Sequence, residues 1–241
     1  MASPAIGTGT GNIQSNTSGL TSCAINAPTN AATGDLLVMA FATSASRTLT
    51  ATGWTSIASI ANSLFTNEVE MFWRTHDGSS SYTVSWSSNI DAVGTIALVT
   101  GADTSSPIDV SATYDSGFTA ATAQTAPSVT TTVADTLLLN FYSAIGNNTW
   151  SPASSQTEVS DVAKGTVFAA ELTKLAVASS GATGTKTSTC SSSAQWVSMS
   201  VAIKPAPSLI KSIGSVPIAS VKKVSGVAIA SAKKVAGVAN T

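Results

Sequence analysis

The residues that could do chemistry in this chain are few and lie far apart. The single histidine, His76, stands beside Asp77 in the turn-like segment RTHDGSSS. A catalytic triad or a metal site needs further ligands or a placed base, and the sequence has no second histidine. We therefore interpret His76 and Asp77 as turn residues and expect no catalysis from them.

Two carboxylates, Glu68 and Glu70, stand two residues apart and would share one face of a strand. Paired carboxylates are the arrangement used for glycoside cleavage. Val69 and Met71 alternate with them and would point into the core, so we expect the glutamates on a solvated strand face. The sequence therefore predicts that the protein is not an enzyme.

No group of residues has the spacing of a cofactor or metal site. Asp103, Asp109 and Asp115 lie near one another in an oxygen-rich segment, but their spacing does not match a known calcium loop and suits turns better. Cys23 and Cys190 are too few for a disulfide framework or a zinc site with cysteine ligands alone. We interpret them as small buried residues, and a bridge between them is left open.

Two of the five tryptophans are candidate ligand-binding residues. Trp54 in TGWTS and Trp150 in NTWSP each follow Gly or an Asn-Thr turn at a similar point of their region of the chain. Exposed loop aromatics can stack on a sugar face. We therefore expect Trp54 and Trp150 in exposed loops, and the other tryptophans in the core.

The elements that would position these residues are short strands. Apolar residues recur with period two or in short runs bounded by Gly, Pro, Asn and Asp. The turns between them leave little room for crossover helices, which favours an antiparallel sheet. The expected strands include DLLVMAFAT (35–43), EVEMFWRT (68–75), YTVSWSS (82–88), GTIALVTG (94–101), DTLLLNFYSA (135–144), TVFAAELT (166–173) and WVSMSVAIKP (196–205).

The strand pattern repeats after roughly a hundred positions. The segment 84–102 aligns without gaps on 188–206, and an Ala-Pro pair precedes a buried run in both regions. We predict an all-β fold, an antiparallel jelly-roll-like β-sandwich at 23–206 built from two pseudo-repeated halves, 27–105 and 126–206. Residues 1–22 would be an N-terminal extension. Two separate small domains are the alternative.

The C-terminal segment 207–241 repeats with a period of eleven residues: IKSIGSVPIAS, VKKVSGVAIAS and AKKVAGVANT. Eleven residues also suit a right-handed coiled coil, but the Gly, Pro and β-branched positions weaken a helix. We favour a strand, a Ser-Gly or Ala-Gly turn, and a second strand in each repeat, and whether the arm is β or helical before assembly is left open. The candidate assembly contacts are Lys211, Ile213, Val216, Lys222, Lys223, Val224, Val227, Lys233, Lys234, Val235 and Val238.

Charge is distributed unevenly along the chain. Only 10% of residues are charged, and all 12 carboxylates lie at or before Glu171. The charged residues after Glu171 are eight lysines. The arm has five lysines and no aromatic side chain to stack on bases, so we expect no nucleic acid partner. The start of the sequence does not resemble a signal peptide, and no run of ~18 apolar residues predicts a membrane span.

Residues 23–206 resemble a β-sandwich domain found in bacteriophage virion proteins and in some bacterial surface proteins. The resemblance rests on GDLLVMAF, GWTSIAS, YTVSWSS, GTIALVTGADTSSPIDV, APSVTTTVADTLLLNF and WVSMSVAIKP in this order. The eleven-residue units resemble repeats at the C-termini of phage structural proteins. The resemblance implies a jelly-roll fold and a virion location, with assembly in the host cytoplasm, and it transfers no catalytic residue.

The expected function is that of a phage virion structural protein, a capsid decoration or a head- or tail-attached appendage subunit, anchored through its C-terminal repeats. Its partners would be other virion proteins and identical copies. The alternative is a carbohydrate-binding adhesin module on a bacterial or virion surface, whose partner would be a host-surface glycan.

Overall fold

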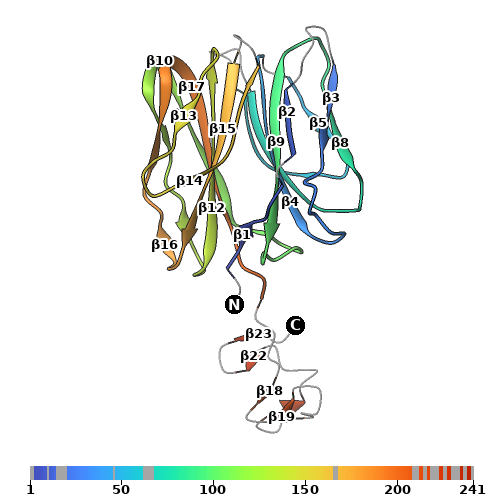
Figure 1. The fold of residues 1–241 in the computed structure, drawn as a ribbon. Coiled ribbons are helices and arrows are strands. Elements are labelled where there is room, and N and C mark those ends of the chain that lie inside the picture. Colours follow the sequence, from blue (N-terminus) through green and yellow to red (C-terminus); the bar gives the residue numbers. More distant parts are fainter. Residues whose placement is uncertain are drawn as a thin grey trace. The chain divides into compact units, whose positions relative to one another are not determined.

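The computed structural model describes residues 3–9, 11–14, 21–45, 47–61, 68–164 and 168–207, and six two-residue strands beyond them. The chain forms two compact units, which divide between Pro205 and Ala206. The larger unit is a β-sandwich made of two halves, drawn in Figure 1 in blue to teal and in green to orange. The expectation of an all-β antiparallel sandwich is confirmed, and the jelly-roll description stays a prediction.

The first half builds a main sheet in the order β1-β9-β4-β7-β6, to which β2 adds by pairing with β9. A smaller sheet, β3-β8-β5, lies on the outer side of this main sheet (Figure 1). The strands are β1 (Ala5–Ile6), β2 (Gly11–Gln14), β3 (Ser22–Asn26), β4 (Leu36–Thr43), β5 (Thr50–Ala51), β6 (Thr55–Ala61), β7 (Glu68–Thr75), β8 (Ser81–Ser85) and β9 (Ala92–Thr100). The expected N-terminal extension thus contributes two strands to the sandwich.

The second half builds a main sheet in the order β10-β17-β12-β15-β14, and β13 also pairs with β17. Each of the long strands β10 and β17 takes the place of shorter, separate strands of the first half. The strands are β10 (Ile108–Ala126), β11 (Thr130–Thr131), β12 (Thr136–Ile145), β13 (Trp150–Ser151), β14 (Thr157–Lys164), β15 (Phe168–Val177), β16 (Gly181–Ala182) and β17 (Lys186–Ile203), with β11 paired to β16.

The two main sheets share their strand order and their register. The pair Leu36 and Val99 in the first half corresponds to Leu137 and Ile203 in the second. The outer pairs β6–β7 and β14–β15 each carry a bulge at the corresponding place. The paired residues of β4, β6, β7 and β9 therefore have definite structural equivalents in β12, β14, β15 and β17.

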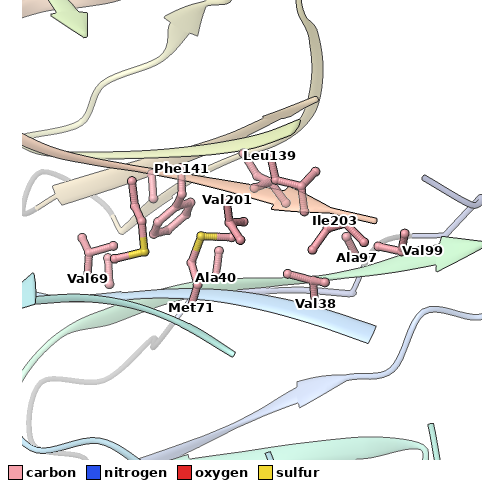
Figure 2. Packing of buried hydrophobic residues seen from close by; sticks show 14 of the residues in the cluster. Val38, Ala40, Val69, Met71, Ala97, Val99, Leu139, Phe141, Val201 and Ile203 are labelled. Atoms are coloured by element: carbon pink, nitrogen blue, oxygen red, sulfur yellow. The ribbon is translucent and has the colours of Figure 1, made fainter. Parts of the chain in front are cut away.

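The central core lies between the two main sheets. Alternate residues of the middle strands, such as Val38 and Ala40 of β4, meet Leu139 and Phe141 of β12 there (Figure 2). Val38, Ala40 and Leu139 are fully buried. Because each main sheet is covered on both faces, β4 is buried along its whole length and reads as one continuous apolar run, LLVMAFAT.

The smaller unit holds the eleven-residue repeats as three β-hairpins. Their strands are β18 (Ser212–Ile213), β19 (Val216–Pro217), β20 (Lys223–Val224), β21 (Val227–Ala228), β22 (Lys234–Val235) and β23 (Val238–Ala239). They pair as β18–β19, β20–β21 and β22–β23, in the same register each time. The prediction of two short strands per repeat is confirmed.

Candidate functional site

The candidate assembly residues fall at corresponding places of the three hairpins. Ile213 pairs with Val216, Val224 with Val227, and Val235 with Val238. Lys223 and Lys234 stand across from Ala228 and Ala239. Lys211, Lys222 and Lys233 lie outside the described residues. The repeat in the sequence is therefore also a repeat in strand pairing.

Trp54 is half-buried between β5 and β6, in contact with other side chains of the first half. The Arg74 guanidinium lies 5.6 Å from the centre of its ring and 4.5 Å from that of Tyr82. The two aromatic rings meet edge to face, with centroids 5.2 Å apart. Arg74 thus covers part of the aromatic surface that a sugar would use, and ligand binding at Trp54 stays a prediction.

Trp150 does not lie in an exposed loop, so that expectation is wrong. It belongs to β13, which pairs with β17, and it is 6% exposed. Its indole Nε1 donates a 3.0 Å hydrogen bond to Oε1 of Gln124, and its backbone N–H donates to Asp161. Trp150 is a core residue here, because its ring belongs to a buried cluster with Tyr142 and Trp196.

His76 and Asp77 lie at a strand end, where they hold a turn together. Hydrogen bonds from the side chain of Ser79 and from its backbone N–H lower the pKa of the Asp77 carboxylate. The hydroxyl of Tyr82 also donates to Asp77, and Nδ1 of His76 lies 2.6 Å from that hydroxyl. The turn interpretation of the two residues is confirmed for Asp77.

Glu68 and Glu70 are not solvated, and this expectation is also wrong. They are 5% and 8% exposed. Glu68 accepts hydrogen bonds from the backbone N–H of Arg47 and the hydroxyl of Ser59, and Glu70 accepts one from Ser56. Burial raises the pKa of Glu70. Neighbouring segments cover both faces of β7, so alternation along the strand does not mark a solvated face.

The aspartates of the oxygen-rich segment serve separate local structures. Asp103 accepts hydrogen bonds from the backbone N–H groups of Ser105 and Ser106, as expected of a turn residue. Asp109 instead accepts from Thr132, far along the chain. Within the described residues, no group of three or more His, Cys, Asp or Glu side chains could hold a metal ion.

A buried polar layer in the second half was not expected from the sequence. It lies on the outer face of the second main sheet and comprises Gln124, Asn140, Glu171, Thr173, Ser188, Ser198 and Ser200, all fully buried. No sequence pattern marked this layer; the strand register of the structure places Glu171 at the position that Glu70 has in the first half.

Most of the polar layer is joined by hydrogen bonds. The amide of Asn140 donates to Ser200 and accepts from Gln156, both at 2.6 Å. Ser188 donates to Oε2 of Glu171 at 2.6 Å. Oε1 of Glu171 and Nε2 of Gln124 are buried without a partner. The layer therefore fixes the second half through directed bonds, with two polar groups left unsatisfied.

Electrostatics single out Glu171 within this layer. Burial, and then the nearby charges of Glu158 and Asp161, raise its pKa to about 7, whereas the hydrogen bond from Ser188 opposes the shift. Asp161 stands directly across from it on β14, and burial raises the pKa of Asp161 as well. A carboxyl group with this pKa can hold or release a proton near neutral pH.

The two cysteines are separate free thiols, each buried in its own half. Burial raises the pKa of Cys23 to about 12 and also raises that of Cys190. Both thiols are therefore protonated at neutral pH and unreactive as nucleophiles. Their interpretation as small buried residues is confirmed.

Across the described ranges, no helix has the length and apolar character needed to cross a membrane. Comparison of the chain with protein-family models, with curated proteins and with solved structures finds no match.

Proposed function

We propose that this chain is a non-enzymatic structural subunit of a bacteriophage virion, a capsid decoration or appendage subunit, and that its C-terminal arm anchors it. The observation that carries the proposal is the arm itself. Three hairpins with the same register follow one another in a unit separate from the sandwich. A repeated docking element on a self-contained domain suits attachment to a larger assembly.

The arm is poorly suited to stability by itself. Each hairpin pairs only two residues per strand, and isolated two-stranded hairpins are marginal in water. Packing on another protein would bury the paired Val and Ile residues and supply the missing stabilisation. The arm is therefore suited to becoming ordered against a partner surface.

Charge indicates the kind of surface. The arm holds five lysines and no acidic residue, whereas all 12 carboxylates belong to the sandwich. An acidic protein surface would attract the arm, and salt would screen that attraction over ~8–10 Å without weakening the apolar contacts. We infer an acidic virion protein as the anchoring partner.

The test is to supply a chain truncated after Pro207 together with the full chain during particle production. Quantitative mass spectrometry of the purified particles then gives the ratio of the two. We expect only the full chain in particles, and equal thermal unfolding of the two sandwiches. A full chain with all five arm lysines changed to Gln is the matched control for charge, and it should incorporate less than one with Arg at those positions.

The outcomes separate the parts of the proposal. Equal incorporation of the truncated chain refutes anchoring by the arm. Absence of both chains from particles refutes the virion role. A truncated chain that no longer folds shows that the repeats belong to the sandwich.

A further inference from the structure

The three arm hairpins correspond to one another in composition and in strand pairing. Each has one pair of branched aliphatic residues beside a two-residue turn: Ile213 with Val216, Val224 with Val227, and Val235 with Val238. A lysine stands two positions before this pair in every repeat. A surface with the chemistry to accept one hairpin can therefore accept any of the three.

The hairpins are also independent of one another in their strand pairing. The pairs β18–β19, β20–β21 and β22–β23 are three separate two-stranded sheets. Among the described residues, no strand of one hairpin pairs with a strand of another hairpin or of the sandwich. The repeats of a solenoid stack into one continuous structure, whereas these hairpins remain three separate units. Each hairpin is thus a docking element by itself.

The chain between successive hairpins has the same length twice. Lys223, where β20 begins, is six positions after Pro217, where β19 ends, and Lys234 is six positions after Ala228. An extended chain spans at most about 3.3–3.6 Å per residue, so the end of one hairpin lies within about 20–22 Å of the start of the next. Both intervals between sites on a partner therefore have the same upper limit.

Equal hairpins at equal intervals fit a partner that repeats. A surface built of identical subunits presents the same site again on each subunit, whereas an irregular surface would need a different hairpin at each place. The arm has five lysines and no acidic residue, so the complementary sites are acidic. Linking binding events raises the overall affinity by about 10²–10⁴ when the linker spans the sites. Three weak hairpin contacts then give stable attachment.

We propose that the three hairpins of one chain bind three equivalent acidic sites on neighbouring identical subunits of its partner. The inference rests on the proposed anchoring role of the arm and adds two properties of the partner. Its equivalent sites hold successive hairpins whose ends lie within about 20–22 Å of each other, and one chain occupies three of these sites.

The first experiment measures the apparent Kd of the chain for particles that were produced without it, by co-sedimentation. Three variants each lack one repeat, residues 210–220, 221–231 or 232–241. Loss of any one repeat should weaken binding at least about tenfold, and loss of any two at least about a hundredfold, because each loss removes one linked contact. The matched control replaces residues 221–231 by an eleven-residue Gly-Ser segment, which keeps the chain length, and it should also bind at least about tenfold more weakly.

The outcomes separate this inference from the anchoring role. A full chain that does not bind overturns both. If the full chain binds, the inference alone is overturned by an unchanged Kd after loss of two repeats, or by a loss of affinity that depends on one particular repeat. Binding that is abolished by loss of any single repeat indicates one continuous interface, and it overturns the inference too.

The second experiment tests whether the three sites are equivalent. In the test chain, the first and third repeats are replaced by copies of the middle repeat, residues 221–231. This chain should bind at least as tightly as the natural one, because the middle repeat has the same type of apolar pair and two lysines where the first repeat has one. The same chain with Ser in place of Val224 and Val227 in all three copies is the control and should lose binding. Weaker binding of the test chain than of the natural chain overturns the proposal.

The same particles give the stoichiometry. Zero-length cross-linking of the arm lysines to carboxylates identifies the subunit that binds the arm, and quantitative mass spectrometry counts both proteins in washed particles. We expect at most one chain for every three copies of that subunit. A higher ratio overturns the proposal, because each chain would then occupy fewer than three sites.

Discussion

The two halves of the sandwich have the same strand order and register, yet they differ at the centre of their outer layers. In the first half the centre of this layer is apolar, with Met39, Phe72 and Ile96 fully or almost fully buried. Their equivalents in the second half are Asn140, Thr173 and Ser200. The same strand order and register are thus compatible with apolar or with polar side chains at these buried positions.

The comparison shows which part of the molecule fixes the fold. The central core is apolar on both sides, with Val38 opposite Leu139 and Met71 corresponding to Leu172. A buried polar layer contributes little net stability, but it is costly when one partner is lost. We therefore infer that the shared core sets the topology, and that the outer layers differ in how they respond to single changes.

The largest expected effect comes from truncating the apolar layer. Phe41 is fully buried, and Phe41→Ala removes a ring and leaves a cavity, which costs about 3–5 kcal/mol of unfolding free energy. Tyr142 is the equivalent of Phe41 in the second half. Tyr142→Phe removes only the hydroxyl, which donates to the carbonyl of Lys186, and costs about 1 kcal/mol of unfolding free energy. Urea denaturation measures both, and a larger loss for Tyr142→Phe would contradict the comparison.

The next effect depends on pH and belongs to the polar layer. Glu171 has a pKa of about 7 in the folded chain against 4.5 for a free carboxyl group. Its contribution is fully stabilising below pH 4.5 and is lost as the pH rises through 7. Glu171→Gln keeps an oxygen for Ser188, so it should raise stability above neutral pH by up to about 3 kcal/mol and change little near pH 4.5.

The control for this pH effect is the equivalent residue of the apolar half. Burial raises the pKa of Glu70 as well, and one carboxyl neighbour, Glu68, adds to this, whereas Glu171 has two, Glu158 and Asp161. Glu70→Gln should therefore give a smaller pH-dependent gain. The measurement is thermal unfolding of wild type, Glu171→Gln and Glu70→Gln across pH 4.5–8.5. Equal pH profiles for wild type and Glu171→Gln would contradict the prediction.

The strands and the arm hairpins could be predicted from the sequence because period-two alternation and turn residues are local signals. The burial of Glu68 and Trp150 could not, because it depends on chain segments that cover the outer faces of the main sheets. The polar layer was missed for the same reason. Asn, Ser and Gln are usually surface residues, so a buried Asn140 looks no different from an exposed one in the sequence.

The smallest expected effect exchanges one pair between the layers. Asn140 and Ser200 face each other across β12 and β17, as Met39 and Ile96 do across β4 and β9. Asn140→Met alone leaves the amide of Gln156 without its acceptor and removes the bond that Asn140 donates to the Ser200 hydroxyl, which still donates to the carbonyl of Pro127, and this costs about 1–3 kcal/mol. Adding Ser200→Ile recreates the apolar pair of the first half but removes the hydroxyl that donates to the carbonyl of Pro127, so only part of the loss should return. A double-mutant cycle by urea denaturation should show coupling of at least about 1 kcal/mol, because the two side chains are in direct contact. If the losses of unfolding free energy from the two single changes simply add in the double mutant, the apolar pair is not accepted in the second half. The outer layers would then help to fix the topology.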